Sequence, residues 1–198
     1  MHISEGVLSG PVLLAGAALA AVGTGIGLKK LDYEQVAKAG MLSAVFFVAS
    51  LVHVPVGPSN AHLILNGLLG LLLGWGAFPA ILVALVLQAV FFQFGGITTL
   101  GANTVIMALP ATLCYLIFGW LVHKNSRAAV VAAFACGFLS VLLSGLFVAF
   151  SLIFTDENFL EVSGIILAAH IPVMIIEGIV TAICVAFLRK VKPDLLLG

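Results

Sequence analysis

Long apolar runs fill most of the chain, and short polar or glycine-rich stretches separate them. A helix that crosses a bilayer needs about 20 mainly apolar residues. Seven runs approach this length, and they cover residues 8–28, 39–55, 62–77, 78–94, 104–122, 128–154 and 163–188. The third and fourth runs are short and are separated by Gly74-Trp75-Gly76, so they form either two short helices or one broken pair. The pattern predicts an all-α membrane helix bundle with about seven transmembrane helices.

The composition supports a single transmembrane domain that covers residues 1–198. Hydrophobic residues make up 63% of the chain, charged residues make up 8%, and the mean hydropathy is +1.29. A soluble domain carries about 25% charged residues, which makes this chain an integral, multi-pass membrane protein. The eight Lys and Arg equal the eight Asp and Glu in number and form no basic cluster, so we expect no nucleic-acid partner.

The basic residues predict the orientation of the bundle. All eight follow the first, fifth or seventh apolar run, at Lys29, Lys30, Lys38, Lys124, Arg127, Arg189, Lys190 and Lys192. With seven spans, these three places lie on one side of the membrane, and the positive-inside rule makes that side the cytoplasm. We therefore expect the N-terminus outside and the C-terminus in the cytoplasm.

Most polar residues of unusual type fall on the predicted outer face. They lie at the start of the chain, in loop 53–61 (HVPVGPSNA) and in loop 94–104 (FGGITTLGANT). Irregular backbone at membrane depth persists only where protein covers it or where it lines a cavity. We therefore expect loop 94–104 to fold into the mouth of the bundle, and we regard Glu5 and Asn103 as candidate residues around a site there.

His2 is the first candidate metal ligand, because a histidine in second position can chelate an ion with the backbone. The terminal amine of Met1, the amide nitrogen of His2 and its imidazole Nδ1 can bind one ion in a plane. Four nitrogens in a square favour Ni²⁺ or Cu²⁺ over Zn²⁺, which prefers a tetrahedron. The competing interpretation is that residues 1–7 are a solvated chain end, and residue type alone favours it.

A second histidine would complete the square. His62 opens the third run in GPSNAHLILNG, and a histidine at membrane depth usually marks a site. Asn66 lies one turn further along the predicted helix and could orient His62 or its ligand. His53, at the outer end of the second run, is the rival candidate. An interfacial histidine that contacts only headgroups remains the alternative for both.

Glu177 is the only acidic residue deep inside a run, and His170 precedes it by seven residues. The two residues could form a proton relay, a structural pair or a contact with another membrane subunit. A stand-alone proton-linked carrier or channel that uses His170 and Glu177 is therefore a second hypothesis. The chain has no GxxxxGK[ST], HExxH or GxSxG sequence, so it neither uses ATP itself nor resembles familiar hydrolases. A membrane metalloenzyme built on His2, His53 and His62 is a third and weaker hypothesis.

Four blocks of the chain, MHISEG, SNAHLILNGLLGLLLG, FGGITTLGANT and IPVMIIEG, together resemble the CbiM/NikM family. These proteins are the substrate-binding membrane subunits of energy-coupling-factor transporters for cobalt and nickel. The resemblance runs from residue 1 to about residue 188. It implies that the N-terminal segment inserts into a seven-helix fold from outside. It also implies a metal site formed by the Met1 amine, the His2 amide and imidazole nitrogens, and His62.

The resemblance further implies the cargo, the partners and the location of the protein. Ni²⁺ or Co²⁺ would be the transported substrate, with no organic cofactor. The partners would be a transmembrane coupling subunit, cytoplasmic ATPase subunits and often a small accessory membrane protein, in a bacterial or archaeal plasma membrane. Cobalt-type members carry Pro-Thr-Gly after the loop histidine, whereas this chain has residues 63–66 (LILN) there. The choice between nickel and cobalt therefore stays open.

Overall fold

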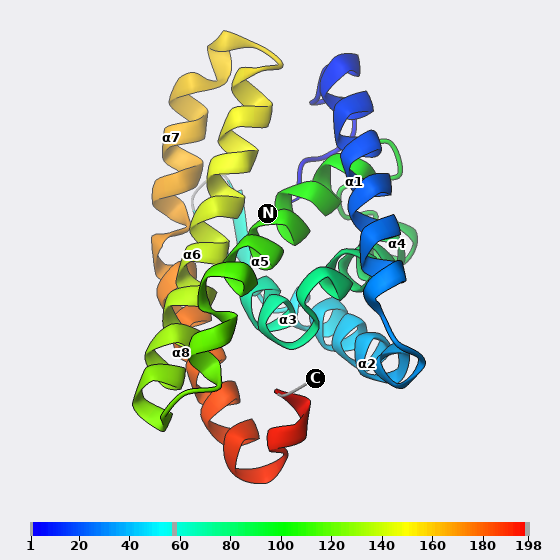
Figure 1. The fold of residues 1–198 in the computed structure, drawn as a ribbon. Helices are drawn as coiled ribbons and strands as arrows, with labels where there is room; N and C mark the ends of the chain where they lie inside the picture. Colours follow the sequence, from blue (N-terminus) through cyan, green and yellow to red (C-terminus); the bar gives the residue numbers. More distant parts are fainter. Residues whose placement is uncertain (1, 57–58, 197–198) are drawn as a thin grey trace.

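A computed structural model of the chain describes residues 2–56 and 59–196, with side chains outside 53–61 and 162. The described residues form a helix bundle with one small antiparallel hairpin (Figure 1). The helices are α1 (Gly10–Lys30), α2 (Tyr33–Ala49), α3 (Asn66–Leu73), α4 (Ala77–Phe92), α5 (Leu100–Val122), α6 (Ser126–Ile153), α7 (Leu160–Ala169) and α8 (Ile171–Val191). The strands are β1 (His53–Val56) and β2 (Ser59–His62), and the 3-10 turns are η1 (Gly74–Gly76), η2 (Glu157–Phe159) and η3 (Pro193–Leu195).

The segment α3–η1–α4 forms the centre of the bundle. Seventy-two per cent of its most apolar window is buried, whereas the corresponding share for α1 is 22%. Helix α5 packs against α3 and α4 and also contacts α1 and α6, so it links the two sides seen in Figure 1. Gly70 permits the close approach of α3 to α5, because an added Cβ would lie 2.2 Å from the Ala111 carbonyl oxygen.

Five helical segments within the described ranges are long and apolar enough to cross a membrane. They are Gly10–Lys30, Asn66–Phe92, Leu100–Val122, Ser126–Ile153 and Glu157–Val191. The third and fourth predicted runs are the two halves of the broken segment Asn66–Phe92. Helix α2 has 17 residues and is shorter than these spans. The chain is therefore a multi-pass helical membrane protein, and the count of about seven spans stays a prediction.

The predicted helices around residue 60 are wrong at their facing ends. The run 39–55 was expected to be helical throughout, but α2 ends at Ala49 and His53 begins strand β1. The run 62–77 was expected to begin a helix at His62, which instead ends β2, four residues before α3 begins. Pro55 lacks the backbone N–H that a continuing helix would need, and β-branched residues such as Val54 favour extended chain. Both residues therefore favour a strand over a helix here.

The last predicted run, 163–188, is two helices rather than one. Helix α7 ends at Ala169, and α8 begins at Ile171 with Pro172 in its first turn. Proline has no N–H and its ring collides with the carbonyl four residues earlier, so it is tolerated at a helix start but interrupts a continuous helix. The break leaves His170 between the two helices.

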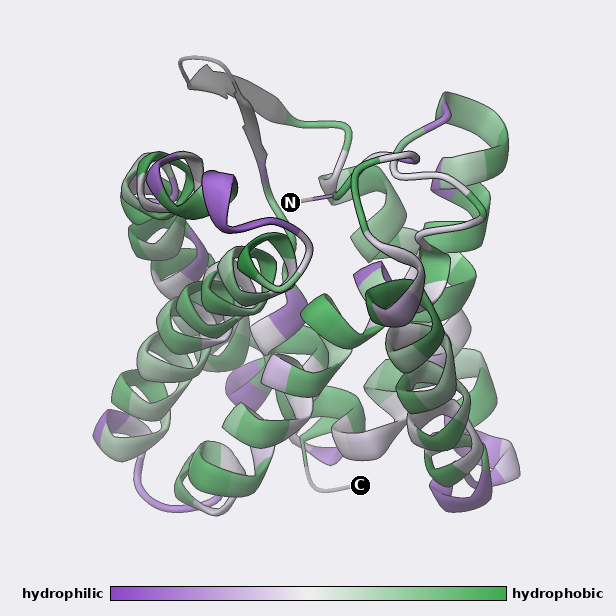
Figure 2. Cartoon of the chain, turned by 90° about the horizontal axis from the view of Figure 1, so that it is seen from above, coloured by the Kyte–Doolittle hydropathy of each residue, from purple (hydrophilic) through white to green (hydrophobic). Residues whose placement is uncertain are grey.

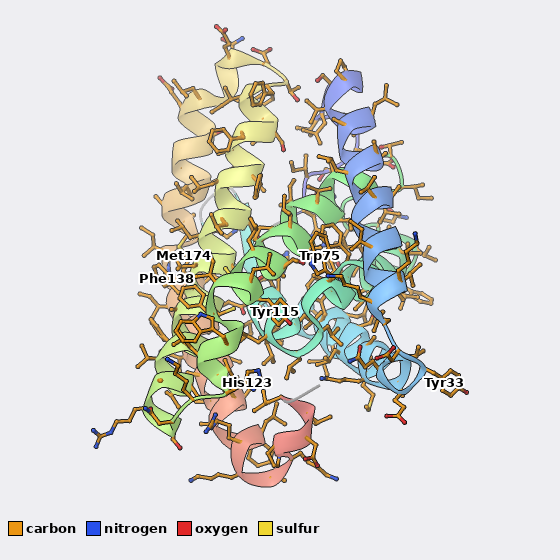
Figure 3. All side chains as sticks on the ribbon, viewed as in Figure 1. Tyr33, Trp75, Tyr115, His123, Phe138 and Met174 are labelled. Atoms are coloured by element: carbon orange, nitrogen blue, oxygen red, sulfur yellow. The ribbon has the colours of Figure 1, made fainter. Side chains whose placement is uncertain are left out.

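The two ends of the bundle carry different chemistry. At one end, Lys38 Nζ donates to the Leu195 carbonyl over 2.6 Å, and Arg189 donates to the carbonyls of Val122 and Lys124. Figure 3 shows that the labelled His123 also lies toward this lower end. At the other end, the backbone N–H groups of residues 9 and 98 bond to the side chains of residues 155 and 5. The basic residues therefore gather at the end opposite the start of the chain.

Candidate metal centre

His2 and His62 lie against each other near the start of the chain. His62 Nε2 is 3.1 Å from His2 Nδ1, and the two rings stack with centroids 4.8 Å apart. His2 belongs to the segment that enters the bundle between its helices (Figure 2), whereas His62 comes from the end of β2. Only 7% of the His62 surface is exposed. The fold thus brings together two imidazoles that are 60 residues apart.

Gln88 of α4 forms a hydrogen bond with the Nε2 nitrogen of His2. His2 Nε2 lies 2.6 Å from Gln88 Oε1, and Gln88 Nε2 donates to Ser50 Oγ over 2.7 Å. Ser50 Oγ in turn donates to the Phe47 carbonyl, so its oxygen accepts from the Gln88 amide group. This chain of bonds orients Gln88 with its oxygen toward His2. An amide oxygen only accepts, which places the His2 proton on Nε2 and a lone pair on Nδ1.

The second imidazole has the complementary arrangement. His62 Nδ1 is 3.1 Å from the Leu63 carbonyl oxygen, which can only accept a hydrogen bond. The proton of His62 therefore lies on Nδ1, and its Nε2 lone pair points toward His2. Burial lowers the pKa of His2 to about 3 and lowers the pKa of His62 well below its usual value, which keeps both rings neutral near pH 7.

Two lone pairs that face each other at this distance favour a cation between them. Nitrogens about 2.0 Å from one ion lie about 2.8 Å apart at adjacent corners of a square and about 4 Å apart at opposite corners. The separation of 3.1 Å between His2 Nδ1 and His62 Nε2 matches adjacent corners. In a chelate made by the amine, amide and imidazole of residues 1 and 2, the vacant corner is adjacent to the imidazole. The distance between the two imidazole nitrogens is therefore compatible with a ligand at that corner.

Asn103, near the start of α5, holds the N-terminal segment by its backbone. The Ile3 N–H donates to Asn103 Oδ1, and Asn103 Nδ2 donates to the Ile3 carbonyl, both over 3.0 Å. Asn103 Nδ2 also lies 3.2 Å from Thr99 Oγ1, which fixes the side chain in this orientation. Two reciprocal bonds to one residue allow little rotation of the backbone next to His2. Asn103 therefore contributes to the site by orienting the segment.

Glu5 holds the same segment against loop 94–99. Its backbone N–H donates to the Gly95 carbonyl, and its carboxylate accepts from Thr98 N and Thr98 Oγ1 over 3.0 and 3.2 Å. The bond from the Thr98 backbone lowers the pKa of Glu5. Gly96 is required here, because it has a φ of +124° and an added Cβ would lie 2.0 Å from Glu5 Cγ. The described bonds of Glu5 thus fasten the segment to the loop.

Asn66 lies in the core, where its described hydrogen bonds connect helices. Its Nδ2 donates to the Met107 carbonyl and to Ser144 Oγ, and its Oδ1 accepts from Gly67 N and Ser140 Oγ. Because α3 begins only at Asn66, the expected helical spacing from His62 is wrong. Asn66 fixes the start of α3 against α5 and α6, and its described bonds are structural.

His170 and Glu177 have separate partners. His170 Nδ1 donates to the Ile166 carbonyl over 2.7 Å within the α7 turn. Glu177 accepts hydrogen bonds from the backbone N–H groups of Ile64 and Leu65. Both side chains are buried, yet each binds backbone groups of a different segment. The hydrogen bonds of the described residues thus supply no chain of donors and acceptors from one to the other.

Met1 lies outside the described residues, and so does the side chain of His53, whose backbone pairs with that of His62. Within the part of the chain that the structure describes, no three His, Cys, Asp or Glu side chains gather closely enough to hold an ion. Among the described side chains, His2 and His62 are the two imidazoles that meet at the candidate centre. Two nitrogens leave further positions around an ion for other donors.

Gln88 and Ser50 are site residues that the sequence interpretation missed. Gln88 is fully buried, and it is the only amide, acidic or basic side chain in the apolar sequence AFPAILVALVLQAVFF of α4. A lone polar residue inside an apolar span is a signal for a buried partner, and it could have been recognised. Ser50 carries no such signal, because the turn after α2 that positions it is visible only in the fold.

Comparison with known proteins gives a consistent result. The family model described as the cobalt uptake substrate-specific transmembrane region, CbiM, matches residues 2–195. A Haemophilus influenzae protein named provisionally for metal transport is 39% identical over 99% of this chain and 97% of its own length. The fused nickel transport protein NikMN of Rhodobacter capsulatus is 32% identical over 99% of this chain, which spans 64% of that longer protein.

A solved structure has the same fold. The crystal structure of a transition metal transporter superposes with a TM-score of 0.80 and 26% sequence identity. The match covers 100% of this chain and 96% of that chain, so the likeness extends through the N-terminal segment as well as the helices.

Proposed function

Because the chain belongs to the CbiM family of cobalt uptake substrate-specific transmembrane regions, we propose that it is the metal-binding membrane subunit of an ATP-driven importer for nickel or cobalt ions. One observation carries the proposal. The Nδ1 of His2 and the Nε2 of His62 face each other at 3.1 Å, while Gln88 and the Leu63 carbonyl occupy their other nitrogens. This arrangement prepares two neutral imidazoles to bind a transition-metal ion.

In the proposed mechanism the hydrated ion arrives at the outer end and exchanges water for nitrogen ligands. The Met1 amine, the His2 amide nitrogen, His2 Nδ1 and His62 Nε2 supply four donors in one plane. The amide nitrogen must lose its proton to bind strongly, so affinity rises with pH. Asn103 and Glu5 hold the segment over the site, which supports residues 1–7 as a metal-binding segment of the single domain.

The physiological metal is either nickel or cobalt. A square of nitrogen ligands favours nickel, and the name of the Rhodobacter relative refers to nickel transport. The family description refers to cobalt uptake. Both ions stay in the proposal, and the residues that surround the square will decide between them.

The chain works with partners in this proposal. It has no phosphate-binding loop sequence, so separate cytoplasmic ATPase subunits hydrolyse ATP. A transmembrane coupling subunit and a small accessory membrane subunit complete the importer, and the fused form of the longer Rhodobacter relative supports a further membrane component. The basic end of the bundle faces the cytoplasm and the N-terminus faces outward, across seven spans of a bacterial or archaeal plasma membrane.

Calorimetric titration of the purified protein with NiCl₂ and CoCl₂ tests the proposal, provided that the native first residue is retained. We expect one ion per chain, and we expect His2→Ala to abolish binding. Phe94→Leu is a matched control, because Phe94 lies beside the His2 ring without a nitrogen ligand. Binding that survives His2→Ala unchanged would contradict the proposed site.

A further inference from the structure

Glu177 is a fully buried acidic side chain that the proposed metal centre does not use. It lies on α8, and 0% of its surface is exposed. A buried carboxylate requires hydrogen-bond donors. Its donors are two consecutive backbone groups: the Ile64 N–H, and the Leu65 N–H at 2.9 and 3.0 Å from the two carboxylate oxygens. A membrane-embedded carboxylate is thus devoted to one short stretch of backbone.

That stretch directly follows the proposed ligand His62. Residues 63–65 connect the end of β2 to the start of α3, and the Leu63 carbonyl accepts the His62 Nδ1 proton. Leu65 has a φ of +54°, a left-handed conformation that is unfavourable for a leucine. The turn that aims His62 therefore contains a strained residue, and Glu177 binds the N–H of that residue.

Other described bonds fix the chain next to Ile64 and Leu65, among them the bond from the Leu63 N–H to the Val52 carbonyl. His62 pairs with His53 through the hairpin, and the side chain of Asn66 fixes the start of α3 against α5 and α6. Between these two points, the described hydrogen bonds to the N–H groups of Ile64 and Leu65 come from Glu177. Substitution of Glu177 should therefore relax the turn locally, while its flanking anchors remain.

We propose that Glu177 is a positioning residue for metal capture, whose carboxylate holds the left-handed turn at Leu65 so that His62 Nε2 points at His2 Nδ1. Glu177 contacts neither the ion nor a ligand nitrogen in this proposal. Its loss would leave two buried N–H groups without their carboxylate acceptor and would allow His62 to leave the plane of the other donors. The inference rests on the proposed function, because it assigns the residue that orients the fourth ligand of that site.

The experiment compares variants of the full chain by calorimetric titration with NiCl₂ and by the absorption spectrum of the nickel-loaded protein. Glu177→Gln should weaken nickel binding about tenfold or more and shift the ligand-field band, because the fourth nitrogen is displaced. Thr181→Val is the matched control: it removes a buried polar atom of the same helix that has no hydrogen-bond partner, and affinity should stay within about twofold.

A second substitution that restores nickel affinity separates a positioning role of Glu177 from a general loss of folding. Glycine adopts a positive φ without strain, so Leu65→Gly retains the turn without the carboxylate. We expect Glu177→Gln combined with Leu65→Gly to regain most of the lost affinity and the wild-type spectrum. If Glu177→Gln does not fold, Glu177→Asp, which withdraws the carboxylate by one methylene, takes its place with the same expectations.

The outcomes distinguish this inference from the proposed function. If Glu177→Gln binds nickel as tightly as Thr181→Val does, or if Leu65→Gly restores nothing, the positioning role is overturned. If His62→Ala loses nickel while Glu177→Gln retains it, the proposed function stands without this inference. If the wild-type protein binds neither nickel nor cobalt, the proposed function and the inference both fail.

Discussion

The described residues near the two ends of the chain both pack against the bundle, but they are held in different ways. At the start, Asn103 bonds to both backbone groups of Ile3, and Gln88 bonds to the His2 ring. At the other end, Lys38 Nζ donates to the Leu195 carbonyl, and the side chain of Leu196 is buried. Each end is thus fixed by residues that are distant in the sequence.

The two segments differ in which atoms their contacts leave available as metal ligands. The C-terminal segment 193–196 is held by a backbone carbonyl and an apolar side chain. These contacts pack the segment against the bundle, and none of the described ones provides a ligand atom. The N-terminal segment 2–6 is held so that one nitrogen of His2 is bonded and the other faces His62. Anchoring alone therefore creates no site. A site arises where the anchors also select a tautomer.

The largest expected effect comes from an extension at the N-terminus, compared with the same extension at the C-terminus. One glycine added before Met1 displaces the amine from the chelate, so nickel affinity should fall at least 100-fold, about 3 kcal/mol. One glycine added after Gly198 should leave affinity within about twofold, because the described C-terminal anchors contribute no ligand atom. Calorimetric titration of both extended proteins measures the difference. Equal nickel affinities of the two extended proteins would contradict the claim that only the N-terminal end supplies ligand atoms.

The next effect separates the two histidines of the hairpin. His62→Ala removes the proposed fourth ligand and should weaken nickel binding about 100-fold, or about 3 kcal/mol. His53→Ala leaves all four proposed nitrogens in place and should change affinity by less than about threefold. The same titration measures both variants, with thermal unfolding as the control for folding. Similar losses in both variants would show that the fourth ligand is assigned wrongly.

A smaller effect is expected from the residues that hold the ends. Gln88→Leu removes the acceptor that fixes the His2 tautomer, and nickel affinity should fall about 10- to 100-fold, as is usual for such partners. Lys38→Met removes the bond to Leu195 at the opposite end and should leave affinity unchanged. Nickel titration against the thermal midpoint of each variant measures the two effects separately. A loss of nickel affinity in Lys38→Met would show that contacts at the C-terminal end also affect the metal site.

The last comparison concerns the pH dependence of docking. The ordinary pKa of histidine is 6.5, and burial lowers that of His2 to about 3. Between these values the released segment binds a proton that the docked segment does not, so docking weakens as pH falls from 6.5 toward 3, by about tenfold per unit. Above pH 7 docking should be constant.

Hydrogen exchange without metal measures this effect, after correction for the intrinsic exchange rate at each pH. Protection of residues 2–6 should fall from pH 7 to pH 5 more than that of residues 193–196, whose described hydrogen bonds involve no imidazole. Equal pH dependence in the two segments would contradict the buried, neutral state of His2.

The helices were largely predictable from the sequence, because apolar runs identify membrane helices independently of their neighbours. The hairpin at residues 53–62 and the break at His170 were not predicted, although Pro55 and Pro172 offered local signals. The pairing of His2 with His62 followed from chelate chemistry and family resemblance. Gln88 was recognisable as a lone polar residue in an apolar span, but its partner His2 and the partners of Glu177 depend on contacts between distant segments, which residue spacing does not reveal.

The most direct test of the account is an anomalous-difference map at the nickel edge from a crystal of the protein grown with NiCl₂ and with its native first residue. The account predicts one peak about 2 Å from both His2 Nδ1 and His62 Nε2, in the plane of the Met1 amine and the His2 amide nitrogen. A peak elsewhere, with the His2 and His62 nitrogens still facing each other and the terminal amine in solvent, would contradict it.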